Sequence, residues 1–262
     1  MQPDSPDPQS DPTDALSAVP AAGARRATPV TGHLRFYYGP MDCGKSTLAL
    51  QVDHNHARQG RVGVLLVRMD RSGRPQISSR IGITRPAVEV SAAADLRGLV
   101  RARWSAGQRV DYLIVDEAQF LTPAQVDQLA ELADDYQVDV YCFGIATDFR
   151  GRLFPGASRL VELADELRPV QVDVLCWCGL PARFNARVVA GQVVREGDTV
   201  LVADTADTAD TETGQSTTEG DEIVSGSGTV GATVRYQVLC RRHFRLGDLG
   251  TTSGVQGQLA FA

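Results

Sequence analysis

The chain has 262 residues, of which 43% are hydrophobic and 22% charged, the composition of an ordinary globular protein with one core and a smaller second unit. Its formal net charge of -6 argues against a general nucleic-acid-binding protein, which usually carries a basic stripe. Because no apolar run approaches the roughly 18–20 residues that cross a bilayer and the first residues do not resemble a secretory signal, we expect a cytoplasmic protein without a membrane partner.

Strand and helix patterns alternate along the first half of the chain. Residues 1–31 are rich in Pro, Asp, Ser and Ala, so we expect a disordered tail there. The pattern predicts strands at His33–Tyr38, Arg61–Asp70, Tyr112–Val115 and 138–146, and helices over 45–60, 93–107 and 122–137, the last with Thr122 as its N-cap and Pro123 at its first position. This order predicts an α/β fold over residues 32–171, in which helices cover both faces of a mostly parallel sheet.

The pattern changes at about residue 172, where short β-type segments begin. We predict a second, smaller domain over residues 172–245. Residues 204–228 contain a tandem "DTA" and almost no bulky apolar side chains, which indicates a flexible insertion. The Gly-rich residues 246–262 are expected to form a loose C-terminal tail.

The stretch "GPMDCGKST" lies between the first predicted strand and the first predicted helix. It matches the phosphate-binding pattern G-x-x-x-x-G-K-[ST] in the structural context that the pattern requires. Backbone N–H groups of such a loop point at phosphate oxygens, the lysine neutralises phosphate charge, and the hydroxyl is a ligand of Mg²⁺. We therefore expect a P-loop that binds ATP through Gly39, Pro40, Met41, Asp42, Cys43, Gly44, Lys45, Ser46 and Thr47.

A second acidic site follows the strand "YLIV". Asp116 lies at the carboxyl end of this strand, where ligands of open α/β sheets bind, and is a second candidate ligand of Mg²⁺ beside Ser46. Glu117 follows it and is the candidate catalytic base. The residues alone leave two enzymes open: a kinase in which Glu117 deprotonates a substrate hydroxyl, and an ATPase in which it activates water.

The smaller domain carries four residues of the zinc-binding type. Cys176 and Cys178 form a C-x-C pair, and Cys240 and His243 form a C-x2-H pair far downstream. Two thiolates and a distant Cys/His pair are typical of a structural zinc site, which stabilises a unit that is too small for a core of its own. A zinc-ribbon nucleic-acid module fused to an ATPase is a further alternative, which the acidic net charge disfavours.

Five stretches, taken together and in this order, resemble the type II thymidine kinases, the cytosolic class that phosphorylates thymidine and deoxyuridine. They are "GPMDCGKST", "DEAQF", "GIATDFRGRLFPG", "CWCG" and "RYQVLCRRHF", and they are spread over most of residues 33–245. The resemblance implies an enzyme of nucleotide salvage that uses ATP and Mg²⁺, carries structural Zn²⁺ in a lasso domain and assembles as a homotetramer.

The resemblance also implies a role for individual residues. Glu117 matches the base that deprotonates the nucleoside 5′-hydroxyl, and Tyr236 matches the lasso tyrosine that closes over the thymine. The remaining residues that match the nucleoside pocket are Met41, Phe120, Ile145, Phe149 and Phe154. In this family the C-x-C pair is more often C-x2-C, and the loop that holds residues 204–228 is shorter.

Overall fold

The computed structural model describes residues 31–68, 75–197 and 234–250. Residues 1–30 of the predicted tail, the insertion at 204–228 and residues 251–262 lie outside this part of the chain. No helix within the described ranges is long and apolar enough to cross a membrane.

Six parallel strands form the main sheet, in the order β5-β2-β6-β7-β1-β8. This arrangement confirms the predicted α/β class with a parallel sheet. The strands are β1 (Leu34–Tyr38), β2 (Gly63–Val67), β5 (Val88–Glu89), β6 (Tyr112–Asp116), β7 (Asp139–Gly144) and β8 (Glu166–Pro169). Because all six strands point the same way, the residues at their carboxyl ends, which include Asp116 and Gly144, share one edge of the sheet.

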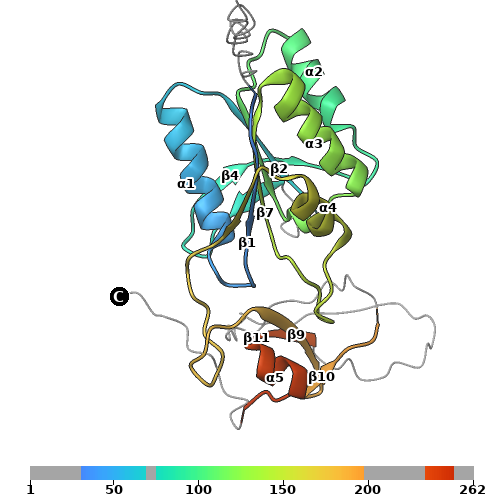
Figure 1. Ribbon diagram of the computed structural model, residues 1–262. Helices are drawn as coiled ribbons and strands as arrows, with labels where there is room; N and C mark the ends of the chain where they lie inside the picture. The colour runs from blue at the N-terminus through green and yellow to red at the C-terminus, as the bar shows by residue number, and fades with distance from the viewer. Residues whose placement is uncertain (1–30, 69–74, 198–233, 251–262) are drawn as a thin grey trace, which may run out of the picture. The chain divides into compact units, whose positions relative to one another are not determined.

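Helices cover both faces of this sheet, as the sequence predicts. Helix α1 (Lys45–Arg58) lies on one face, and α2 (Leu96–Ser105), α3 (Pro123–Tyr136) and α4 (Pro155–Leu163) lie on the other (Figure 1). Alternate strand residues divide between the two cores, since successive side chains of a strand point to opposite faces. In β6, for example, Leu113 and Val115 belong to the core under α2, α3 and α4, whereas Ile114 belongs to the core under α1.

Helix α3 begins as predicted, with Pro123 at its first position and Thr122 as its N-cap. The Oγ1 of Thr122 accepts a hydrogen bond from the N–H of Gln125 at 3.2 Å, and the Oε1 of Gln125 accepts one from the N–H of Thr122 at 3.1 Å. This capping box satisfies two N–H groups that a helix start leaves without partners, which stabilises the helix by about 1 kcal/mol.

The sequence prediction lacks α4, β5, β8 and the hairpin of β3 (Gln76–Ser78) and β4 (Thr84–Pro86). Strand β8 pairs with β1 at the edge of the sheet. The short strands of the hairpin and the exposed residues of β4 and β8 leave no clear apolar period in the sequence.

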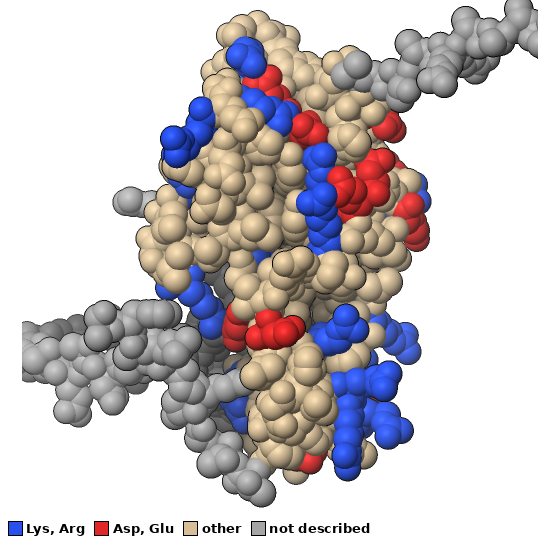
Figure 2. All heavy atoms as spheres, turned by 60° about the vertical axis from the view of Figure 1, so that its left-hand side comes forward, with Lys and Arg blue, Asp and Glu red and all other residues tan. Residues whose placement is uncertain are grey.

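A smaller antiparallel sheet has the order β10-β9-β11. Its strands are β9 (Phe184–Val189), β10 (Gln192–Val194) and β11 (Val234–Leu239), and helix α5 (Arg241–Leu246) follows β11 (Figure 1). Seven buried apolar residues, which include Leu239 and Phe244, form the core of this unit. Basic side chains gather around it on the face shown in Figure 2, and α5 alone carries three exposed arginines, Arg241, Arg242 and Arg245.

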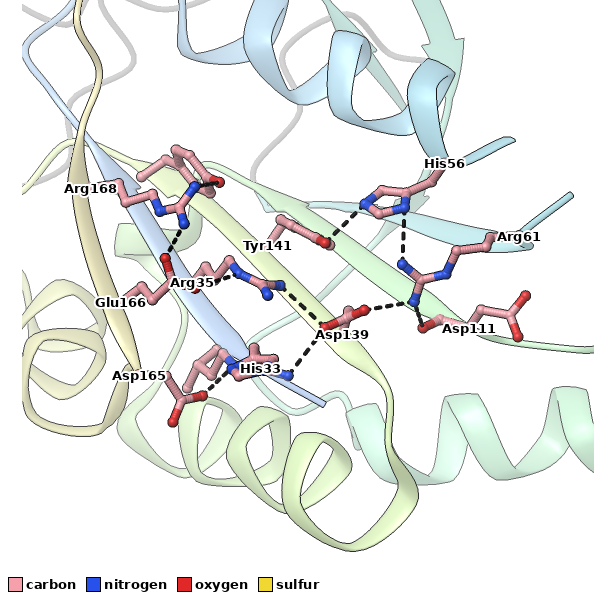
Figure 3. Close-up of polar contacts among 12 residues, drawn as sticks. His33, Arg35, His56, Arg61, Asp111, Asp139, Tyr141, Asp165, Glu166 and Arg168 are labelled. Atoms are coloured by element: carbon pink, nitrogen blue, oxygen red, sulfur yellow. Dashed lines mark hydrogen bonds and ion pairs between the residues drawn. The ribbon is translucent and has the colours of Figure 1, made fainter. Parts of the chain in front are cut away.

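The amino ends of the strands are joined by a network of charged side chains (Figure 3). Asp139 accepts hydrogen bonds from Arg35 at 3.2 Å and from Arg61 at 2.7 Å. Burial alone raises the pKa of the Asp139 carboxyl, but the hydrogen bonds from Arg61 and Arg35 outweigh it, so this pKa lies below its ordinary value. The network therefore fixes the end of the sheet that lies opposite the phosphate loop.

Candidate active site

The phosphate loop connects β1 to α1. Gly44 takes the left-handed conformation, with φ of 80°, directly before Lys45 opens the helix, and glycine adopts this conformation without a steric penalty. The buried Lys45 ammonium donates hydrogen bonds to the carbonyl oxygens of Pro40 at 2.7 Å and Gly39 at 3.4 Å. The positive charge thus lies over the loop, where the helix N-terminus also favours an anion.

Other loop residues hold the loop's shape. Cys43 is fully buried, whereas the exposed Asp42 forms an ion pair with Arg80, at 2.5 Å between Oδ1 and a guanidinium nitrogen. The sequence offers no signal for this contact, because Arg80 lies 38 positions downstream, in the turn between β3 and β4.

Ser46 and Asp116 lie in direct contact. The Ser46 hydroxyl donates a hydrogen bond to Oδ2 of Asp116 at 2.7 Å. Asp116 is only 5% exposed, and burial, with repulsion from the neighbouring Glu117 carboxylate, raises its pKa to about 6. The structure thus brings together a hydroxyl and a carboxylate of the kind that hold Mg²⁺ in P-loop enzymes.

Glu117 follows in an unusual backbone conformation. Its φ is 54°, in the left-handed region that residues with a side chain rarely adopt, and such strain clusters at functional sites. The N–H of Glu117 donates to Oδ1 of Asp116 at 3.0 Å, and its carboxylate accepts a hydrogen bond from Nε2 of Gln119 at 2.5 Å. The two carboxylates are therefore neighbours at the carboxyl end of β6.

The residues expected around the nucleoside fall into two groups. Phe120 packs edge-on against Phe154, with ring centroids 5.5 Å apart, and Ile145, Phe154, Met41 and Phe120 lie in or against the main core. Phe154 ends its loop rather than lying within it, because it is the N-cap of α4 and Pro155 begins the helix.

Phe149 and Tyr236 form the second group, around Arg187 of β9. The Arg187 guanidinium lies 3.7 Å from the centroid of the Phe149 ring, and its Nε donates to the Tyr236 hydroxyl at 3.2 Å. Arg187 is 1% exposed. It therefore links the loop after β7 to the small sheet, a role that sequence reasoning missed.

Asp148 organises the loop between β7 and α4. Its carboxylate accepts hydrogen bonds from the backbone N–H groups of Arg150 and Arg152, both at 2.9 Å, and from Nε of Arg150 at 3.0 Å. Asp148 is only 5% exposed. Its carboxylate thus holds the segment that carries Phe149.

Asn185, on β9, reaches the phosphate loop. Its Oδ1 accepts a hydrogen bond from the N–H of Met41 at 2.8 Å. Asn185 and Arg187 are both buried and alternate along one strand, so they occupy the same face. In the sequence, two polar residues two positions apart within an otherwise apolar strand are the signal for this face of β9.

The four predicted zinc ligands lie together, with their ligand atoms all within 4.8 Å of one another. Nδ1 of His243 is 3.4 Å from Sγ of Cys176 and 3.5 Å from Sγ of Cys240, and the Sγ atoms of Cys178 and Cys240 are 4.0 Å apart. Tetrahedral zinc, with bonds of about 2.3 Å to sulfur and about 2.1 Å to nitrogen, separates its ligand atoms by roughly 3.6–3.8 Å. The three separations lie close to this range, so the four residues could together hold a metal ion such as zinc.

Known proteins resemble this chain over most of its length. The family model described as "Thymidine kinase" matches residues 32–244. The thymidine kinase of Cutibacterium acnes is 50% identical over 220 residues, which cover 84% of this chain and 91% of that protein. The thymidine kinase of Streptomyces avermitilis is 48% identical over 212 residues, or 81% of this chain and 88% of that protein. The chain belongs to the thymidine kinase family.

Proposed function

We propose that the protein transfers the γ-phosphoryl group of ATP to the 5′-hydroxyl of thymidine, and also of deoxyuridine, and so forms nucleoside monophosphate for nucleotide salvage. The observation that carries this proposal is the direct contact of the phosphate loop with the end of β6, through Ser46 and Asp116, beside Glu117. Membership of the thymidine kinase family supports the choice of nucleoside.

The loop and its lysine bind the phosphates. Backbone N–H groups of the loop, the start of α1 and the Lys45 ammonium attract the anionic oxygens. Ser46 and Asp116 would hold Mg²⁺, which supplies positive charge against the charge that develops on the transferred group. In-line transfer needs little more than such positioning and electrostatics.

Glu117 acts on the acceptor. Its carboxylate accepts the proton of the 5′-hydroxyl as the oxygen forms its bond to phosphorus and the bond to the ADP oxygen breaks. The aromatic residues Phe120, Phe149, Phe154 and Tyr236, together with Met41 and Ile145, enclose the base and sugar and keep water from the phosphoryl group.

The Cys176, Cys178, Cys240 and His243 cluster would hold structural zinc in the smaller unit. Four protein ligands fill the coordination shell of zinc, as in structural rather than catalytic sites. The homotetramer and the cytoplasmic location implied by the resemblance stay predictions, and sedimentation of the purified protein tests the first.

A coupled assay with ATP, Mg²⁺ and a panel of deoxynucleosides tests the function. We expect ADP and nucleoside monophosphate to appear together, fastest with thymidine and deoxyuridine and far more slowly with deoxycytidine and deoxyguanosine. If ADP appears at the same rate without a nucleoside, the protein is an ATPase in which Glu117 activates water.

A further inference from the structure

Gln119 is a buried amide between the proposed base and the wall of the nucleoside pocket. It is 1% exposed. Its Nε2 donates to Oε2 of Glu117 at 2.5 Å, and its Oε1 accepts from the N–H of Ile145 at 3.1 Å. An amide donates only through nitrogen and accepts only through oxygen, so these two partners fix which way the group is turned.

The backbone beside Ile145 leaves room for this amide. A Cβ atom on Gly144 would lie 2.6 Å from Oε1 of Gln119 and 3.1 Å from its backbone nitrogen. A Cβ atom essentially never lies within 3.0 Å of another heavy atom, and the tight 3.1 Å contact would be with a backbone nitrogen held within the turn Ala118–Phe120. The end of β7 therefore approaches Gln119 more closely than any residue with a side chain allows.

The position of the Glu117 carboxylate depends on this contact. Glu117 is the single residue in the left-handed conformation between β6 and the turn Ala118–Phe120. Its side chain is only partly buried. Packing alone therefore restricts its rotamer weakly, whereas a hydrogen bond from a fully buried amide restricts it strongly.

We propose that Gln119 is a positioning residue, which holds the Glu117 carboxylate in a fixed relation to the Ile145 backbone. This inference rests on the proposed function, because it requires Glu117 to be the base and Ile145 to border the nucleoside. Gln119 takes no proton and does not touch the reacting atoms. It sets the distance between the base and the substrate that lies against the end of β7.

A double-mutant cycle with Glu117 tests this role. Gln119→Met keeps the length of the side chain and removes both hydrogen bonds. In the unmutated chain we expect it to lower kcat roughly 10- to 100-fold while KM for ATP changes less than about twofold, because a misplaced base costs turnover and not phosphate binding. In the Glu117→Gln background the same change is expected to lower kcat less than about threefold, since no base remains to be placed.

The expected cycle differs from that of a structural role. If Gln119 merely stabilises the fold, its loss lowers kcat by the same factor in both backgrounds, and that result overturns the proposal. Gln125 supplies the matched control, because it is 2% exposed and its Nε2 donates to the backbone carbonyls of Ser91 and Ala94, with no contact to Glu117 or Ile145 among those described. We expect Gln125→Met to lower Tm and to leave kcat unchanged.

Gln119→Glu separates the two hydrogen bonds and replaces Gln119→Met if the latter does not fold. It keeps an oxygen that accepts from the Ile145 N–H and loses the donor to Glu117. We expect kcat to fall in the unmutated chain and to change little in the Glu117→Gln background, with multiplicative effects again overturning the proposal. If Glu117→Gln alone keeps full turnover, the proposed role of Glu117 fails first, which is a different result.

Discussion

Asn185 accepts a hydrogen bond from the backbone N–H of Met41, although 144 positions separate the two residues. The contact joins β9 of the small sheet to the phosphate loop. The Met41 side chain reinforces it, because it packs against the core of the main sheet and also against the core of the small unit. Displacement of the small sheet would therefore remove a restraint on this loop.

Asn185→Ala therefore has an expected catalytic effect. Loss of the acceptor leaves the Met41 N–H without this partner, at a cost of about 1–3 kcal/mol, and frees the loop. We expect kcat/KM for ATP to fall about 10-fold in steady-state assays, with the zinc content unchanged. Asn55→Ala is the control, since Asn55 is exposed on α1 and bonds only to Gln51 among the contacts described; equal effects of the two changes contradict the prediction.

Glu117→Gln tests the base directly. The amide has the shape of the carboxylate but cannot accept the hydroxyl proton, so we expect kcat to fall about 10²- to 10⁴-fold. ATP binding, measured by calorimetry, should stay within about threefold, because the P-loop is untouched. Glu162→Gln, at an exposed carboxylate on α4, should keep full turnover. Near-normal turnover of Glu117→Gln removes Glu117 as the base.

Asp116→Asn tests the proposed Mg²⁺ site. The change removes a negative charge beside Ser46, and an amide is a weaker ligand of Mg²⁺ than a carboxylate. We expect the Mg²⁺ concentration at half-maximal activity to rise at least about 10-fold, measured at saturating nucleoside. Asp127→Asn on α3, where the carboxylate pairs with Arg159, should leave this concentration unchanged. An unaltered Mg²⁺ requirement in Asp116→Asn assigns the metal to other groups.

Zinc content tests the cluster of the small unit. We expect about one zinc per chain by elemental analysis and at least about 100-fold weaker zinc binding in Cys178→Ser, since one of four ligands is lost. Tm should fall with the metal, because binding to a structural site is coupled to folding. Cys142→Ala, at a buried thiol of β7, is expected to lose stability only through a cavity and to keep its zinc. Equal zinc content in all three proteins argues against the site.

The parts of the site that the sequence predicts are those whose residues lie close together in the chain. The P-loop, the Asp116–Glu117 pair and the two halves of the cysteine cluster each lie within a few residues, and their chemistry follows from spacing. The main sheet is predictable for a similar reason, because β2, β6 and β7 are apolar runs between amphipathic helices.

Contacts between distant segments account for what the sequence does not predict. Gln119 and Asn185 are ordinary polar residues in the sequence, and each becomes significant only when folding brings a distant backbone N–H group to its side chain. Helix α4 does carry a start signal, Pro155 at its first position, but the helix has only nine residues.

Asp139→Asn tests the charged network at the amino ends of the strands. Burial raises the pKa of Asp139 in the folded state, but Arg61 and Arg35 lower it by more, so the net shift is downward. The ionised carboxylate therefore stabilises the fold above the unfolded pKa of about 3.9. This stabilisation is lost as pH falls through the lower folded pKa. At pH 7 we expect Asp139→Asn to lower the free energy of unfolding by about 2–4 kcal/mol, because two charge-assisted hydrogen bonds are weakened. Denaturant unfolding should show this difference shrinking toward zero as pH falls below about 4. Asp134→Asn, at an exposed carboxylate of α3, should have nearly the same free energy of unfolding as the unmutated chain at either pH. If Asp139→Asn is destabilised equally at both pH values, the packing of the side chain and not its charge stabilises the amino ends of the strands.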